Sequence, residues 1–309
     1  MTGVVGDAGG TSEAGLEQLA ELAERYYAAG DATRKPLSYL AAYARLFEGR
    51  RDAALRILEL GVSSGASVLI WRDYLPRAII VGVDLSEAPA SLEGQERIHF
   101  VRGSQDDPEI LDRAARVAGG EFDLIIDDAS HIGYLTKRSF IYLFPRWLAR
   151  GGWYVIEDLG TAFMPEYPDG ESYQTPAWED AVPGAVVFEG HQHGMLGVVK
   201  QLIDHMMQEL STGVRSYLPV DSITIEPNIA FIRKSREPGS AWPKTLPSGH
   251  TPSRIDVAAS ISEIREELAR QNGQIQDMAK VLGRVVGLLR PFRIGWRALT
   301  GRGAVPPLS

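Results

Sequence analysis

The sequence contains no cysteine among its 309 residues. Disulfide bonds, cysteine-ligated zinc, iron–sulfur clusters and thiol nucleophiles are therefore excluded. The chain also lacks any apolar run of the roughly 18 residues that a transmembrane helix requires. Residues 1–30 contain no basic stretch followed by an apolar one, so we expect no secretory signal and a cytoplasmic protein.

The sequence has fewer basic than acidic residues, with 32 lysines and arginines against 40 aspartates and glutamates, so the net charge is −8. This balance argues against a dedicated nucleic-acid binder. The charge is uneven, because residues 283–309 contain five arginines and no acidic residue. The apolar fraction of 44% is ordinary for a globular chain and excludes global disorder. We therefore expect an acidic folded body with a basic end and no nucleic-acid partner.

Apolar runs alternate with helical patterns along the middle of the chain. Continuous runs rich in β-branched residues predict strands buried on both faces, at residues 55–60, 78–84, 98–101, 122–127 and 153–157. Patterns of helical period predict helices at residues 12–29, 36–47, 67–74, 107–117, 135–148 and 196–210. This order predicts a doubly wound, mostly parallel α/β sheet. Residues 222–226 and 229–233 flank a turn and predict an antiparallel pair that closes it.

The chain divides into segments of different composition. Residues 1–35 are expected to form a flexible start with an N-terminal helix, and residues 36–234 the main domain. Within that domain, residues 159–193 are rich in proline, glycine, glutamate and tyrosine without clear periodicity. So long an irregular segment predicts a lid or acceptor loop. Residues 235–255 contain several prolines and predict a linker.

The C-terminal part has a heptad pattern of its own. Apolar positions from Val257 to Leu289 are spaced alternately four and three apart, with one polar position at Gln271. This pattern predicts a helix at residues 256–290 that joins copies of the chain into a homo-oligomer; packing on its own domain is the alternative. Residues 291–309 form a basic tail, for which we favour docking on an acidic face of a sister subunit over contact with an anionic membrane.

A glycine-containing loop follows the first predicted strand. Glu59 precedes Gly61, Ser63 and Gly65 where the strand turns into a helix, and glycines there let backbone N–H groups approach a ligand closely. The spacing matches neither the dinucleotide-binding fingerprint nor a P-loop. Asp84 ends the second strand, where a carboxylate can accept hydrogen bonds from both hydroxyls of a ribose.

This loop resembles motif I of the class I S-adenosylmethionine-dependent methyltransferases. The resemblance implies that Glu59 orients the methionine part of the cofactor. Ser63 stands where that family often has glycine. The resemblance also implies an adenine contact after the third strand, where this chain has Ser104, Gln105 and Asp106.

Four carboxylates and a histidine follow the fourth and fifth predicted strands: Asp127, Asp128, His131, Glu157 and Asp158. Ligands of open α/β sheets bind at the carboxyl ends of strands, so neighbouring strands would bring these groups together. A bound divalent cation would neutralise the repulsion among the carboxylates most simply. Because the ligands are oxygen atoms, Mg²⁺ is favoured, with Mn²⁺ or Ca²⁺ as alternatives. His131 is a candidate general base for a hydroxyl proton.

The motif Asp-Asp-x-Ser-His, followed by Ile-Glu-Asp, resembles the metal-dependent sugar O-methyltransferases of the macrolide-glycoside and rhamnosyl type. The resemblance covers residues 36–234 and implies a seven-stranded Rossmann-like fold. It implies that Asp128, Glu157 and Asp158 ligate Mg²⁺ and that His131 is the general base. Asp127 is grouped with the cofactor-binding residues and would orient the site. The implied reaction is methyl transfer from S-adenosylmethionine to a hydroxyl of a glycoside or oligosaccharide.

Two other functions stay open at this point. A catechol or other phenol has adjacent oxygens that would chelate the metal in the same way, so it is an alternative acceptor. A methyltransferase fold without activity that serves as an assembly module through the C-terminal helix is the alternative from another class. The residues do not identify the sugar or the hydroxyl position.

Overall fold

The computed structural model describes residues 9–28, 34–172, 191–212, 218–236 and Arg270. The chain divides into two units, residues 1–243 and 244–309, and Arg270 is the described residue of the second. Several predicted segments lie outside the described residues: the heptad helix, the basic tail, nearly all of the linker and residues 173–190 of the predicted lid. Those expectations therefore stay predictions.

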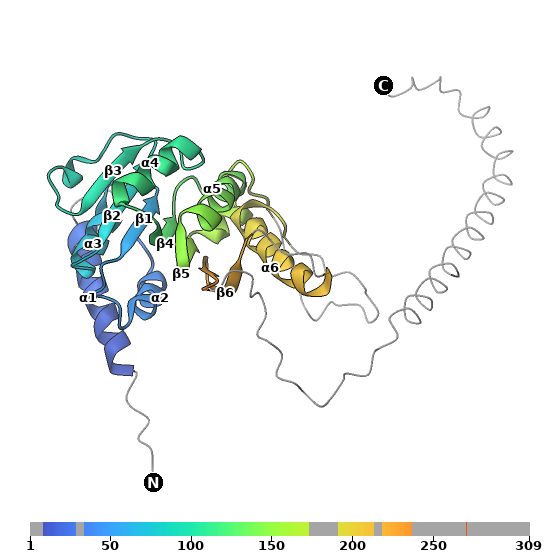
Figure 1. Cartoon of the computed structure of the whole chain (residues 1–309), viewed down its shortest axis with the longest axis horizontal. Coiled ribbons are helices and arrows are strands. Elements are labelled where there is room, and N and C mark those ends of the chain that lie inside the picture. The colour runs from blue at the N-terminus through green and yellow to red at the C-terminus, as the bar shows by residue number, and fades with distance from the viewer. Residues whose placement is uncertain (1–8, 29–33, 173–190, 213–217, 237–269, 271–309) are drawn as a thin grey trace, which may run out of the picture. The chain divides into compact units, whose positions relative to one another are not determined.

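Seven strands of the described chain form one mixed sheet in the order β3-β2-β1-β4-β5-β7-β6 (Figure 1). The strands are β1 (Arg56–Leu60), β2 (Ile79–Asp84), β3 (Ile98–Arg102), β4 (Phe122–Asp127), β5 (Leu148–Ile156), β6 (Val220–Glu226) and β7 (Ile229–Lys234). Strands β1 to β5 are parallel, whereas β7 pairs antiparallel with β5 and β6 antiparallel with β7. The predicted doubly wound sheet with an antiparallel closing pair is confirmed.

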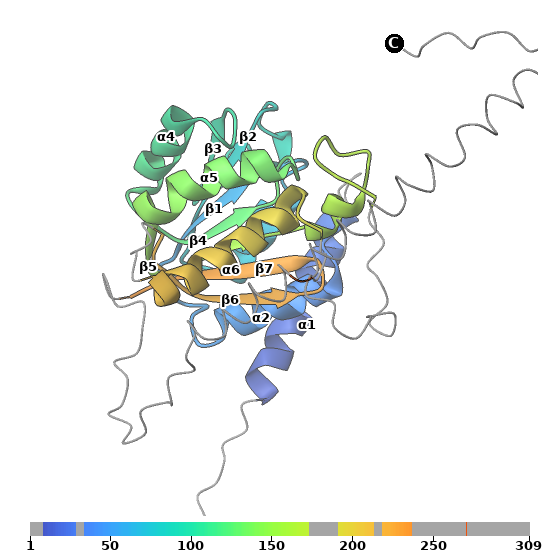
Figure 2. The same cartoon turned by 90° about the vertical axis from the view of Figure 1, so that its right-hand side faces the viewer.

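Helices cover both faces of this sheet. On one face lie α1 (Gly9–Tyr27), α2 (Leu37–Phe47) and α3 (Ala66–Tyr74); on the other lie α4 (Pro108–Ala118), α5 (Gly133–Arg146) and α6 (Gly194–Thr212). Helices α5 and α6 run side by side, as Figure 2 shows. Short 3-10 helices occur at η1 (Ala90–Leu92) and η2 (Leu159–Phe163). None of the described helices is long and apolar enough to span a membrane.

Strand β5 begins earlier than the sequence pattern predicts. It starts at Leu148, which pairs with Phe122, and the register shifts before Leu124 pairs with Trp153. Gly151 has a φ of 75°, a backbone conformation that glycine adopts readily, and the irregular stretch around it lies before the apolar run from which the strand was predicted. The helix predicted to reach 148 accordingly ends at Arg146.

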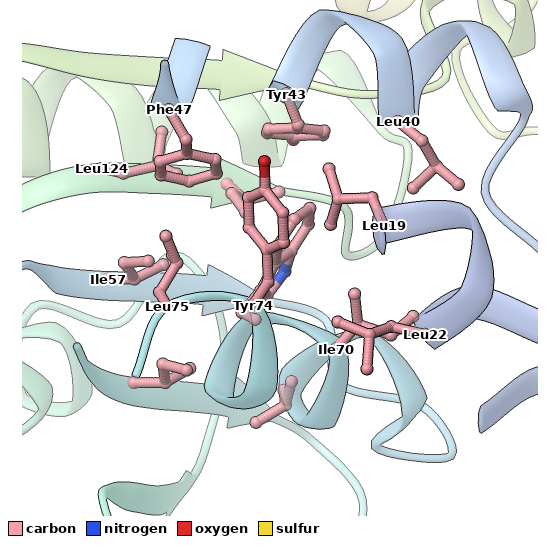
Figure 3. Close-up of a cluster of buried hydrophobic side chains, with 14 of the residues drawn as sticks. Leu19, Leu22, Leu40, Tyr43, Phe47, Ile57, Ile70, Tyr74, Leu75 and Leu124 are labelled. Atoms are coloured by element: carbon pink, nitrogen blue, oxygen red, sulfur yellow. The ribbon is translucent and has the colours of Figure 1, made fainter. Parts of the chain in front are cut away.

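An aromatic cluster fixes α2 against α3 (Figure 3). The ring of Tyr43 lies 4.7 Å from that of Trp71, and the ring of Phe47 lies 6.0 Å from that of Tyr74. All four residues are at most 2% exposed. Buried aromatic rings supply large apolar contact areas, so this packing holds α2 at a defined angle to the sheet. As a result the hydroxyl groups of α2 can reach the carboxyl end of β5.

At Gly61 the loop after β1 packs against the backbone of the loop after β4. A Cβ atom added there would lie 2.1 Å from the backbone oxygen of Asp128, and the φ of Gly61 is +87°. We expect Gly61→Ala to lower the free energy of unfolding by about 3 kcal/mol or more, measured by urea denaturation.

The matched control is Gly94→Ala, because Gly94 has a φ of +69° and nothing within 4 Å of the added Cβ. It should cost only the left-handed backbone penalty of about 1–2 kcal/mol. Equal losses in the two variants would show that the contact between the two loops is not tight.

Candidate active site

Two adjoining cavities lie at the carboxyl ends of the parallel strands. The larger has a volume of about 320 Å³, and its border includes Lys35, Ser63, Asp128, His131 and Asp158. The smaller has a volume of about 150 Å³, and its border includes Asp84, Gly103, Ser104, Gln105 and Ser130. Gly61 and Ala129 border both. The structure therefore brings most of the predicted site residues to one edge of the sheet.

Asp84 fastens the glycine-containing loop. Its Oδ2 accepts hydrogen bonds from the N–H groups of Val62, at 2.8 Å, and Ser63, at 3.1 Å. Burial works against its charge, but these bonds and one from the N–H of Ser86 lower the pKa of Asp84. Ser63 has a φ of 48°, a conformation for which glycine is the usual residue. The loop thus keeps its shape without the middle glycine.

Three predicted adenine-contact residues follow β3, and only two of them border the smaller cavity. Ser104 and Gln105 border it. Asp106 instead accepts a hydrogen bond from Ser104 Oγ at 2.5 Å and lies 3.2 Å from Nε of Arg138. The side chain of Gln105 is buried, and its Oε1 accepts from the N–H of Ser130 at 3.1 Å. Gln105 thereby ties the end of β3 to the loop that carries the histidine.

Asp127 lies beneath the site and borders neither cavity. It is 1% exposed and accepts hydrogen bonds from Gln105 Nε2, at 3.1 Å, and the hydroxyl of Tyr154, at 2.9 Å. Burial raises the pKa of Asp127 to about 7, and the bond from Tyr154 offsets part of that rise. Its contacts support the loop after β4 from below.

Two tyrosines of α2 hold the acidic residues after β5. Tyr39 and Tyr43 are four residues apart and share one helix face. The hydroxyl of Tyr43 donates to Glu157 Oε1 at 2.6 Å, and that of Tyr39 donates to Asp158 Oδ1 at 2.8 Å. Asp158 has a φ of 58°, so the chain turns sharply there and both carboxylates face α2.

Lys35 is a central residue of the site to which the sequence analysis assigned no role. Its Nζ lies 2.7 Å from Asp128 Oδ2, 2.5 Å from Glu157 Oε2 and 3.7 Å from Glu59 Oε1, and its side chain is 6% exposed. Burial opposes the charge of Lys35, but the three carboxylates raise its pKa well above the usual value. Only indirect features of the sequence point to Lys35. Four converging carboxylates require a positive charge nearby, and Lys35 directly precedes the predicted helix that carries Tyr39.

Glu59 is fully buried, and neither of its oxygens has a hydrogen-bond partner among the described residues. Burial raises the pKa of Glu59 to about 7, although the nearby ammonium lowers it in part. A buried carboxylate without a hydrogen-bond partner suits a cationic group that can donate hydrogen bonds. The position predicted to hold the methionine part of a cofactor fits that role.

Asp128, His131 and Asp158 form a candidate cation site, since each offers a ligand atom and these atoms lie within 4.8 Å of one another. His131 Nε2 is 3.8 Å from Asp158 Oδ2, and His131 Nδ1 is buried without a partner among the described residues. His131 has a φ of 55°, which turns the loop towards the larger cavity. Both oxygens of Glu157 are engaged by Tyr43 and Lys35. Two of the three donors, Asp128 and Asp158, are carboxylates, which a hard divalent cation prefers, whereas the imidazole of His131 is not such a ligand.

Comparison with known proteins finds similar sugar O-methyltransferases. The chain is 33% identical over 215 residues to the 8-demethyl-8-alpha-L-rhamnosyl tetracenomycin-C 2'-O-methyltransferase of Streptomyces olivaceus, covering 65% of this chain and 51% of that protein. It is 34% identical over 218 residues to the mycinamicin VI 2''-O-methyltransferase of Micromonospora griseorubida, covering 66% and 50%. No family model matches the sequence.

A solved structure of the MycE methyltransferase in complex with Mg, S-adenosylhomocysteine and mycinamycin VI superposes with a TM-score of 0.60 and 30% identity. The match covers 79% of this chain and 59% of that one. The chain is therefore similar, in sequence and in fold, to class I S-adenosylmethionine-dependent methyltransferases. It spans about half the length of the curated sugar O-methyltransferases that it matches. The resemblance to the sugar O-methyltransferase group is confirmed.

The raised pKa of Asp127 predicts how the free energy of unfolding depends on pH. The pKa is 3.8 for an ordinary aspartate and about 7 in the folded chain. Between these values the folded chain holds a proton that the unfolded chain has lost, so this group makes the free energy of unfolding fall as pH rises from about 4 to about 7. Asp127→Asn should flatten that fall, measured by urea denaturation at a series of pH values. Parallel profiles for the two proteins would contradict the assignment.

Proposed function

We propose that this methyltransferase moves a methyl group from S-adenosylmethionine to a sugar hydroxyl of a glycoside or oligosaccharide, with Mg²⁺ at the acidic cluster. The observation that carries the proposal is the convergence of Asp128, His131 and Asp158 on one cavity, with the buried carboxylate of Glu59, which lacks a hydrogen-bond partner among the described residues, beside Lys35 at the same edge of the sheet. The curated relatives named above support the sugar acceptor, since both are named for glycoside 2-hydroxyl positions.

The cofactor would lie across the two adjoining cavities. Glu59 would accept hydrogen bonds from the amino group of its methionine part, and Asp84 from the ribose hydroxyls. The loop from Gly61 to Gly65 would bring backbone N–H groups close to it. Ser104 and Gln105, which border the smaller cavity, would contact the adenine. Asp106 and Asp127 would support these contacts, because they accept hydrogen bonds from Ser104 and Gln105 respectively.

The divalent cation would be held by Asp128, Glu157 and Asp158. It would supply a positive charge that lowers the pKa of the acceptor hydroxyl. Tyr39 and Tyr43 orient the two carboxylates after β5 through the hydrogen bonds described above. These contacts hold the ligand set in place between α2 and the sheet.

His131 would act as the general base. Its ring nitrogen takes the hydroxyl proton while the freed electron pair of the sugar oxygen forms the new bond to the methyl carbon. The carbon–sulfur bond breaks at the same time, its electrons stay on sulfur, and S-adenosylhomocysteine leaves as a neutral thioether. Asp158 Oδ2, 3.8 Å from His131 Nε2, would stabilise the resulting imidazolium. Much of the rate would come from holding the two reactants in line.

Replacement of the base tests this scheme. His131→Ala should lower the rate of methyl transfer by about 10²–10⁴-fold, because the hydroxyl proton loses its acceptor. S-adenosylhomocysteine binding, measured by calorimetry, should be preserved. The matched control is His99→Ala, an exposed histidine on β3, which should leave the rate unchanged.

The assay uses a panel of glycosides beside catechols, with and without a chelator. Transfer to glycosides that chelation abolishes is the expected result. Transfer that survives both chelation and His131→Ala would refute the scheme, and transfer to catechols alone would refute the sugar acceptor. A chain that fails to bind the cofactor would favour the assembly module.

We also propose that the heptad segment at residues 256–290 joins copies of the chain into a homo-oligomer. The basic tail would dock on a sister subunit, and the protein would be cytoplasmic. The absence of a nucleic-acid partner is also a prediction, supported by the net charge of −8.

A further inference from the structure

The ammonium group of Lys35 occupies a position between two of the proposed metal ligands. It lies 2.7 Å from Asp128 Oδ2 and 2.5 Å from Glu157 Oε2, on carboxylates that follow different strands. A divalent cation that binds both carboxylates needs the same oxygen lone pairs. The ammonium and a bridging divalent cation therefore exclude each other from this position, by both space and charge.

The geometry points to an exchange of cations: we propose that Lys35 is a built-in counter-ion that holds Asp128 and Glu157 together until a divalent cation displaces it. This inference rests on the metal site of the proposed function. It makes Lys35 a positioning residue, because it acts on the metal ligands rather than on a substrate.

Two features of the surroundings allow the exchange. Lys35 precedes α2 and its side chain borders the larger cavity, so a flexible four-carbon stem has space beside it into which the ammonium can withdraw. A third carboxylate, Glu59, lies 3.7 Å from the ammonium and lacks hydrogen-bond partners among the described residues. The displaced charge would thus keep a buried partner.

The exchange also predicts that the site prefers divalent cations to monovalent ones. Three buried or half-buried carboxylates face one ammonium, so the cluster has an excess of negative charge. In place of the ammonium, a monovalent cation would bring one positive charge to Asp128 and Glu157, whereas a divalent cation would bring two. We therefore expect Lys35 to exclude Na⁺ and K⁺ and to yield to Mg²⁺ or Mn²⁺.

Calorimetric titration of Mn²⁺ into the full chain, without cofactor or sugar, tests the inference. Lys35→Met should bind Mn²⁺ at least about tenfold more tightly than the wild type, because no internal cation competes. Without metal, the variant should melt at a lower temperature than the wild type, since its buried carboxylates have lost their counter-ion. Mn²⁺ should then raise its melting temperature by the larger amount.

The matched control is Lys137→Met, which removes the same charge from an exposed lysine that contacts Gln201 on the opposite face. It should bind Mn²⁺ as the wild type does. Equal or weaker binding by Lys35→Met would overturn the inference, and so would the absence of Mn²⁺ binding in both proteins.

A second measurement uses the wild-type chain and does not depend on how the variant folds. Acetylation of lysines, followed by mass spectrometry, should show that the reactivity of Lys35 rises as Mn²⁺ is added, while that of Lys137 stays constant. A fall or no change at Lys35 would contradict the exchange. Neither measurement involves methyl transfer, so a chain that passes both yet transfers no methyl group would refute the proposed reaction alone.

Discussion

One buried ammonium group determines how the carboxyl edge of this sheet is organised. Parallel strands end at the same edge, so Glu59 near the end of β1 and the acids after β4 and β5 are brought close together, where their charges repel. Lys35 lies among them and contacts two directly. The tyrosines of α2 bind the outer oxygens of the acids after β5. The site therefore depends on the segment that carries Lys35 and on the aromatic packing that fixes α2.

Left-handed backbone conformations recur at the strand exits that form the site. Ser63, His131 and Asp158, after β1, β4 and β5, have φ values of 48°, 55° and 58°. Such conformations cost about 1–3 kcal/mol each for residues other than glycine, and the surrounding hydrogen bonds must compensate. Asp84 secures the first of these loops and Gln105 the second. The sharp turns direct polar groups into a common cavity that straight strand ends would not reach.

Much of the fold and of the site could be predicted because their signals are local in the sequence. Runs rich in β-branched residues mark buried strands, and the rule that ligands bind at their carboxyl ends identified Asp84, Asp128 and Asp158 as candidates. Lys35 could not be found in this way. It bonds to residues 93 and 122 positions away, and it lies outside any periodic pattern. The contact of Gln105 with Ser130 is equally non-local, and a bulge concealed the start of β5.

The strand ends are proposed to form a single site for a methyl donor and a divalent cation. A crystal of the chain grown with Mn²⁺ and S-adenosylhomocysteine tests it most directly through anomalous scattering. We expect one manganese peak within bonding distance of Asp128, Glu157 and Asp158. The amino group of the thioether product should lie on Glu59, and the ammonium of Lys35 should be withdrawn from Glu157. No peak at these carboxylates, or a product bound away from Glu59, would contradict it.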